Sequence, residues 1–206
     1  NPESKTYGIW SWFLEEPLDQ MAPPDWNWAD FCGAQLLNAV IYHKDGFPPE
    51  LLEKVNDSIY HAARSIERRN VSVGYTNIAI MGTYVTMMTA ELQNLPDLKN
   101  YAMERLQRFY DYTMKNGAFN EYNSPTYTLV ALEELARMRL HFTDSGAKEL
   151  VDDLTYLAWE EIALHFHPPT RQWAGPHSRC YHTLLPDNKL AFIQANTSDA
   201  VQFDGI

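Results

Sequence analysis

The chain is poor in cysteine, in glycine and in long apolar runs. Its 206 residues include 2 cysteines, which are too few for a disulfide framework. The 9 glycines form no glycine-rich phosphate-binding loop, so we expect no nucleotide chemistry. No window approaches the roughly 18 uninterrupted apolar residues of a membrane-spanning helix, so we expect no membrane partner.

Positive charge is also scarce. The chain carries 16 lysines and arginines against 27 acidic residues, for a formal net charge of −11. Because phosphate contacts need clustered Lys and Arg, we expect no nucleic-acid partner. The remaining composition, 45% apolar and 21% charged, is that of one compact globular domain with its own core.

The two ends of the chain carry no recognisable terminal signal. The chain begins at Asn1-Pro2-Glu3, without an initiator Met or the apolar region of a signal peptide, and stops at Asp204-Gly205-Ile206. We therefore expect it to be a piece of a longer protein. The compartment stays open between extracellular and cytoplasmic.

Six stretches have apolar residues at helical spacing, and short connections pair them into antiparallel hairpins. The expected hairpins span about residues 26–69, 75–116 and 124–167, followed by an irregular or β segment over 168–206. The acidic run in the sixth stretch, which includes Glu160 and Glu161, is expected to be the solvated face of an outer helix. The expected fold class is all-α.

Polar and aromatic residues recur at the hairpin junctions. Trp26, Tyr75, Asn123 and Trp173 hold the same place in the cycle and are separated by 49, 48 and 50 residues. Such a period is typical of a helical repeat or of a toroid built from hairpins. Three hairpins would form only part of a ring, which further chain or a partner copy could complete.

The junctions also hold much of an aromatic excess, which comprises 6 Trp, 12 Tyr and 9 Phe. Aromatic rings stack on the C–H faces of sugars, and neighbouring planar polar groups bond their hydroxyls. We therefore expect an oligo- or polysaccharide ligand. The candidate substrate-binding residues are Trp26, Trp28, Tyr75, Tyr122, Asn123, Tyr127 and Trp173.

Three segments resemble parts of the six-hairpin (α/α) toroid enzymes, and most closely the polysaccharide lyases of the alginate-lyase and heparinase kind. They are the runs 75–84 (YTNIAIMGTY), 121–127 (EYNSPTY) and 175–181 (GPHSRCY). The resemblance implies a carbohydrate-active enzyme whose site lies in a cleft between hairpins. Toroid lyases carry an Asn-His pair where this chain has Asn77 and Ile78, so His177 would supply the imidazole from another loop.

Two reactions fit the residues at these junctions. In β-elimination on a uronate, Asn77 and Arg179 would neutralise the carboxylate, while His177 and Tyr181 would act as base and acid. In hydrolysis, Asp30 and Glu121 would be the pair of carboxylates.

We favour elimination of the two, because the cluster from His177 to Tyr181 has no evident core purpose. A non-catalytic repeat protein that binds a glycan or a protein partner is the third hypothesis. We expect neither a cofactor nor a metal site, since the spacing of His and Cys matches no closed zinc pattern.

Overall fold

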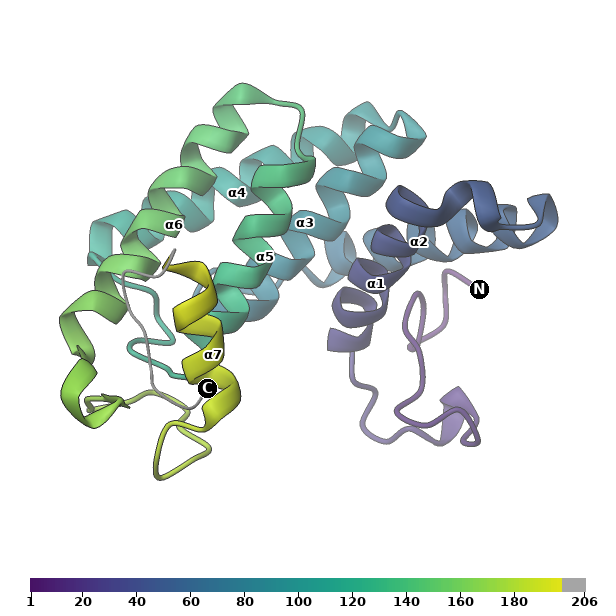
Figure 1. Cartoon of the computed structure of the whole chain (residues 1–206). Coiled ribbons are helices and arrows are strands. Elements are labelled where there is room, and N and C mark those ends of the chain that lie inside the picture. Colours follow the sequence, from purple (N-terminus) through teal and green to yellow (C-terminus); the bar gives the residue numbers. More distant parts are fainter. Residues whose placement is uncertain (198–206) are drawn as a thin grey trace.

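The computed structural model describes residues 1–197, and these form an all-α domain built from antiparallel helical hairpins (Figure 1). Each hairpin pairs two long helices, as the apolar spacing predicts. They are α1 (Asn27–His43) with α2 (Pro49–Arg69), α3 (Thr76–Gln93) with α4 (Pro96–Asn116), and α5 (Tyr127–His141) with α6 (Ser145–His165). The expected fold class and the three hairpins are confirmed.

The first helices of the hairpins form one layer and the second helices cover it. Helix α3 packs between α1 and α5, while α4 and α6 contact each other behind them. The N-terminal ends of α1, α3 and α5 lie at one side of the domain. Asn27 in α1 contacts Tyr75 before α3, and Tyr75 and Tyr127 in α5 both lie near the guanidinium of Arg179. The hairpins therefore follow one another in an arc, and the loops before the inner helices share a rim.

The segment after α6 contains the expected short strands and also a helix that was not expected. Strands β1 (Phe166–His167) and β2 (Gln172–Trp173) pair antiparallel around the 3-10 helix η3 (Pro168–Thr170). Helix α7 (Asp187–Asn196) then packs against α6, with Phe192 stacked on Trp159 at 6.4 Å between ring centroids.

The expectation of an irregular segment over 168–206 is thus wrong for residues 187–196. The larger apolar residues of α7 stand together at 190–193 instead of recurring at helical spacing, and only Leu190 and Ile193 are buried. Packing against α6 stabilises helix α7, which its own sequence pattern would not do. The last part of that expectation, residues 198–206, lies outside the described residues.

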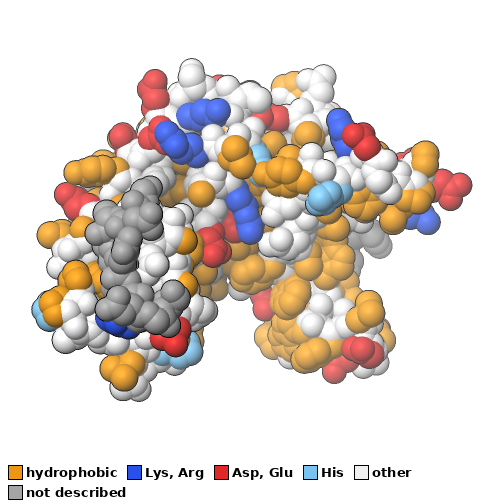
Figure 2. Space-filling view, in the orientation of Figure 1, with side chains coloured by type: hydrophobic (Ala, Val, Ile, Leu, Met, Phe, Trp, Pro, Cys, Tyr) orange, Lys and Arg blue, Asp and Glu red, His pale blue; other side chains and the backbone are white. Residues whose placement is uncertain are grey.

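The chain before α1 and the segment after α6 both project from the rim side of the arc (Figure 1). The first includes the 3-10 helix η1 (Leu18–Gln20), and a third 3-10 helix, η2 (Lys44–Gly46), links α1 to α2. Figure 2 shows an open hollow between the two projecting segments. None of the described helices is both long and apolar enough to cross a membrane.

Helix α3 is the centre of the core. Every residue from Thr76 to Ala90 is buried, because α1, α2, α4 and α5 all pack against this helix. A helix surrounded in this way must be apolar on all sides. Its threonines fit because Thr83, Thr86 and Thr89 donate their hydroxyls to backbone carbonyls four residues earlier.

Gly82 is the point of closest approach around α3. A Cβ placed there would lie 2.6 Å from Oδ1 of Asp30 on α1, 2.9 Å from Nη2 of Arg105 on α4 and 3.0 Å from a methyl carbon of Ile66 on α2. All three side chains are buried. The absence of a side chain at Gly82 therefore sets how closely three helices approach the fourth.

Gly82→Ala should destabilise the domain by about 1–3 kcal/mol, because the new methyl group overpacks a site closed on three sides. Gly46→Ala is the matched control, since nothing lies within 4 Å of a Cβ at that position. Urea unfolding of both variants measures the free energy of unfolding. Equal stability of the two variants would contradict the close packing described for Gly82.

Candidate functional site

Two loops meet beside the N-terminal ends of α3 and α5, and Asn123 joins them. Its backbone has φ of 48°, a left-handed conformation that Asn tolerates better than most residues. The side-chain oxygen accepts a hydrogen bond from the indole of Trp173, and the amide nitrogen donates to the carbonyls of Ala174 at 2.8 Å and Pro176 at 2.9 Å. Asn123 is fully buried and thus positions the loops, although the sequence suggested contact with a substrate.

A carboxylate from α6 holds the same corner. Oε1 of Glu161 accepts hydrogen bonds at 2.9 Å from the backbone N–H of Asn123 and from the hydroxyl of Thr128. Burial raises the pKa of Glu161, and these two donors partly oppose that rise. The expectation that Glu161 belongs to a solvated face is therefore wrong, because the loop before α5 folds over this end of α6.

Glu121 connects the loop to α3 and to the C-terminal segment. It is only 6% exposed. Its Oε2 accepts from the backbone N–H of Asn77 at 2.9 Å, in the first turn of α3, where helical N–H groups lack internal partners. Its Oε1 accepts from Nη1 of Arg179 at 2.5 Å. One buried carboxylate therefore fixes Arg179 relative to the inner helices.

The guanidinium of Arg179 contacts three tyrosines. Two lie at the starts of α3 and α5, and the third is in the same loop as Arg179. Its guanidinium carbon lies 4.0 Å from the ring centroid of Tyr127 and 5.9 Å from that of Tyr75. Nη2 donates to the hydroxyl of Tyr127 at 2.7 Å and to that of Tyr181 at 3.1 Å. We name Glu121, Arg179, Tyr75, Tyr127 and Tyr181 the arginine–tyrosine cluster.

The two tyrosines whose hydroxyls bind Arg179 have pKa values shifted in opposite directions. The hydroxyls of Tyr127 and Tyr181 are 3.2 Å apart. Hydrogen bonds from Tyr127 and from Arg179 lower the pKa of Tyr181. Burial, together with the hydrogen bond to Tyr181, raises the pKa of Tyr127 to about 12. Paired groups that differ in this way are suited to act as base and acid.

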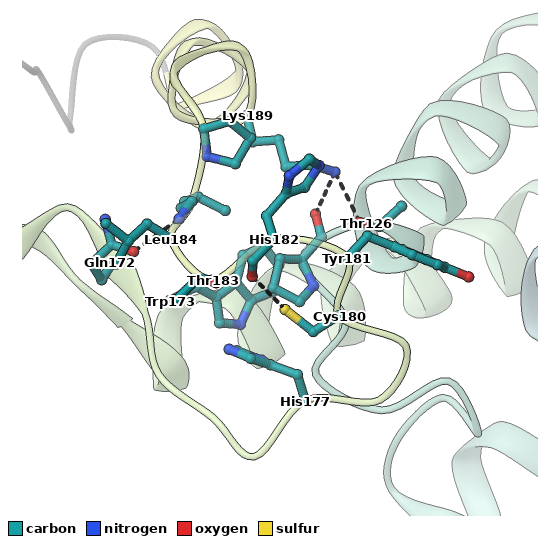
Figure 3. Close-up of a pocket in the computed structure, with 13 residues that line it drawn as sticks. Thr126, Gln172, Trp173, His177, Cys180, Tyr181, His182, Thr183, Leu184 and Lys189 are labelled. Atoms are coloured by element: carbon teal, nitrogen blue, oxygen red, sulfur yellow. Dashed lines mark hydrogen bonds between the residues drawn. The ribbon is translucent and has the colours of Figure 1, made fainter.

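His177 belongs to the same loop as Tyr181 and, like that residue, lines a hollow beside the start of α7. Its Nδ1 lies 2.8 Å from the carbonyl oxygen of Asn123, which can only accept, so Nδ1 carries the proton and Nε2 is the basic nitrogen. In Figure 3 the imidazole lies below the other labelled residues of this hollow, while the phenol of Tyr181 extends away from them to the right. The hydroxyl of Tyr181 is bound there by Arg179. The expected base and acid, His177 and Tyr181, therefore do not point toward a common atom.

Asn77 is next to the cluster but not on its surface. The residue is buried, and its Oδ1 has no hydrogen-bond partner within residues 1–197. Its backbone N–H, not its amide, makes the contact to Glu121. The side chain predicted to neutralise a substrate carboxylate is thus covered in this structure.

The predicted aromatic residues fall into separate groups. Tyr75 and Tyr127 belong to the arginine–tyrosine cluster. Tyr122 donates its hydroxyl to Nε2 of His165 at 2.9 Å, since Nδ1 of that histidine faces a backbone carbonyl. Trp173 is buried against Asn123.

The two tryptophans at the start of α1 lie elsewhere. The indole of Trp26 donates to the carbonyl of Lys5 at 3.0 Å and lines a hollow of the N-terminal segment. Trp28 packs edge-on against Phe31, with ring centroids 6.2 Å apart, and lines an apolar hollow together with Trp10. The aromatic candidates therefore do not share one cleft.

Sequence reasoning missed two polar residues that extend the cluster toward α2. Nδ2 of Asn27 donates to the hydroxyl of Tyr75 at 3.3 Å. Oδ1 of Asn27 accepts from Nη1 of Arg69 at 2.7 Å. Asn27 lies between two tryptophans at a repeat junction, which was a usable signal, whereas Arg69 at the end of an outer helix had none.

Asp30, one of the two expected hydrolytic carboxylates, is in the core. It is 2% exposed, and its Oδ1 has no hydrogen-bond partner among the described residues. Burial raises the pKa of Asp30 to about 7, although Arg105 and Arg69 oppose the rise. Asp30 faces Gly82 and Arg105 instead of Glu121, so the structure does not bring the two carboxylates to one surface.

Asp30 should make stability depend on pH. Between its ordinary pKa of 3.8 and about 7, the folded chain keeps a proton on Asp30 that the unfolded chain releases, so folding becomes less favourable as pH rises through this window. Relative to Asp30→Asn, the wild type should lose up to about 1.4 kcal/mol of unfolding free energy per pH unit. Urea unfolding of both proteins across the window measures this, and a difference that is constant with pH would contradict the burial of Asp30.

The described part of the chain contains no group of three or more His, Cys, Asp or Glu residues placed to hold a metal ion.

Comparison with known proteins gives a family but no function. Residues 1–196 match the family described as a domain of unknown function, DUF8769. No curated protein and no solved structure matches the chain. Because the match spans nearly the whole sequence, the chain belongs to the DUF8769 family.

Proposed function

We propose that this protein binds a uronate-containing glycan at the arginine–tyrosine cluster and cleaves it by β-elimination, as a polysaccharide lyase. The observation that carries the proposal is the pair of hydroxyls held by Arg179. Tyr127 and Tyr181 lie within hydrogen-bond distance of each other, and their pKa values are shifted in opposite directions. An elimination needs a base and an acid of this kind at adjacent positions.

The reaction assigns a separate task to each hydroxyl. Deprotonated Tyr181 takes the proton from C5 of the uronate, and the electrons of that C–H bond form a double bond between C4 and C5. The bond from C4 to the glycosidic oxygen breaks, and Tyr127 donates its proton to the leaving oxygen. A proton then passes from Tyr181 to Tyr127 across their 3.2 Å separation and restores both groups.

Arg179 supports both steps through hydrogen bonds. Its Nη2 stabilises the phenolate of Tyr181, which is why that group can act as a base below its ordinary pKa. The enolate that develops on the substrate carboxylate also needs donors. Glu121 offsets the charge of Arg179 and fixes its position, so its contribution is directional hydrogen bonding more than net charge.

The assignment differs from the one that the sequence suggested. Tyr127, which was expected only to bind substrate, takes the role of the acid, and His177 is assigned no proton transfer. Hydrolysis by Asp30 and Glu121 has less support, because Asp30 is buried and both oxygens of Glu121 already accept hydrogen bonds. The resemblance of three segments to toroid lyases agrees with elimination.

Tyr181→Phe should lower the rate of elimination by about 10²- to 10⁴-fold, because it removes the base without removing the ring. Tyr127→Phe should cause a comparable loss. The assay follows the unsaturated product, which absorbs in the near ultraviolet, over a panel of uronate polysaccharides. Tyr156→Phe is the matched control, since this tyrosine is 71% exposed on α6 and belongs to no proposed site.

Full activity in Tyr181→Phe would refute the assignment of the base. Binding of an acidic glycan by the wild type without any unsaturated product would refute elimination and favour the non-catalytic glycan-binding hypothesis.

A further inference from the structure

The hollow lined by Trp26 lies between the N-terminal segment and the end of α2. It has a volume of about 320 Å³, which is within the range of small-ligand pockets. Its lining includes Lys5, Trp26, Arg68 and Arg69 but, within residues 1–197, no acidic residue. In a chain with a net charge of −11, three cations around one hollow without a carboxylate are an unusual concentration of positive charge.

Both arginines are held in place by neutral groups. Nη1 of Arg68 donates to the carbonyl of Pro2 at 2.7 Å, and its guanidinium carbon lies 4.6 Å from the ring centroid of Tyr7. Nη1 of Arg69 donates to the side-chain oxygen of Asn27. Each guanidinium has five N–H donors, so most donors stay open to a ligand.

No ion pair compensates either guanidinium among the described residues. Neither Arg68 nor Arg69 has a carboxylate within 4.0 Å there, in contrast to Arg64 on the same helix, which pairs with Glu67 and Asp97. Arg69 interacts electrostatically with the buried Asp30, but only beyond ion-pair distance. The charge of the hollow is therefore available to an anion.

Trp26 gives the hollow a second kind of surface. Its indole N–H is bound to the carbonyl of Lys5, which fixes the orientation of the ring. The residue is 39% exposed, so part of the ring is accessible. A fixed aromatic face beside cations is suited to a ring-shaped ligand with a negative substituent, because the ring can stack while the arginines bind the anion.

The hollow is connected to the arginine–tyrosine cluster through two side chains. Arg69 donates to Asn27, Asn27 donates to the hydroxyl of Tyr75, and the ring of Tyr75 faces Arg179. These contacts make the cluster and the hollow neighbours on the same rim, so one chain-like ligand could contact both. This continuity favours an oligosaccharide over an isolated small anion.

We propose that the hollow formed by Lys5, Trp26, Arg68 and Arg69 binds an acidic sugar unit of the same glycan, apart from the bond that is cleaved. This inference rests on the proposed function, because it assumes that the glycan also occupies the arginine–tyrosine cluster. The anionic group is a carboxylate or a sulfate ester, both of which match the planar donors of Arg. The hollow supplies the attraction for a polyanion that Arg179, already paired with Glu121, does not.

Calorimetric titration with three hexasaccharides tests the proposal: an unsulfated polyuronate, a sulfated oligomer without uronate, and a neutral glucan. The variants are Arg68→Gln and Arg69→Gln, each made in the wild type and in Tyr181→Phe. Each should weaken binding of an acidic hexasaccharide at least about tenfold, since a charged hydrogen bond is lost. Which acidic oligomer binds more tightly identifies the anionic group.

Arg139→Gln is the matched control, because it removes the same charge from an exposed residue at the far end of α5 and should change affinity less than twofold. The double variant Arg68→Lys, Arg69→Lys keeps the charge but not the planar donors, so its affinity should lie between those of the wild type and of the Gln variants, which a general loss of fold would not produce.

Unchanged affinity for both acidic oligomers in Arg68→Gln and Arg69→Gln would overturn the inference, even if Tyr181→Phe abolishes elimination. Equal affinity for the neutral glucan would also overturn it. Affinity losses in the arginine variants without any unsaturated product from the wild type would refute the proposed elimination alone, because they would still support the second site.

Discussion

The buried carboxylate of Glu121 is the constraint on which the candidate site depends. An ionised carboxylate inside a protein must be surrounded by donors, since its desolvation otherwise costs several kcal/mol. Here the donors are a free N–H at the start of α3 and the guanidinium of Arg179. The first donor anchors the loop to the inner layer, and the second orients Arg179 toward Tyr127 and Tyr181. A residue predicted as a reactive carboxylate is thus better understood as the positioning group for two hydroxyls.

Most of the fold could be predicted from the sequence, because long amphipathic helices with short connections leave few arrangements. The three hairpins and the repeat of about 49 residues between junctions follow from that pattern, and both agree with the structure. Helix α7 could not be predicted, since tertiary contacts and not its own periodicity stabilise it. Glu161 could not be assigned either. It occupies an acidic run, and only the loop that folds back through Asn123 reveals that it is buried.

The candidate site could be predicted in part. The structure brings together five of the candidates that the junction segments supplied, because residues before successive inner helices share a rim. They are Tyr75, Glu121, Tyr127, Arg179 and Tyr181. The sequence could not show where the side chains of the candidate residues point. It could not show that the phenol of Tyr181 extends away from the hollow that His177 lines, that Asn77 is covered, or that Asp30 points into the core. Arg68 and Arg69 lay outside every motif, since their importance comes from a hollow formed with the N-terminal segment.

The proposed chemistry requires that Arg179 and the contact between the two hydroxyls separate the pKa values of Tyr127 and Tyr181. The most direct measurement is a pH titration of the protein by NMR with ¹³C-labelled tyrosine, with the two resonances assigned through the phenylalanine variants. The pKa of Tyr181 should be below the ordinary value of 10.0 and that of Tyr127 near 12, and Arg179→Gln should raise the pKa of Tyr181. Two resonances that both titrate near 10.0, with no response to Arg179→Gln, would contradict the claim.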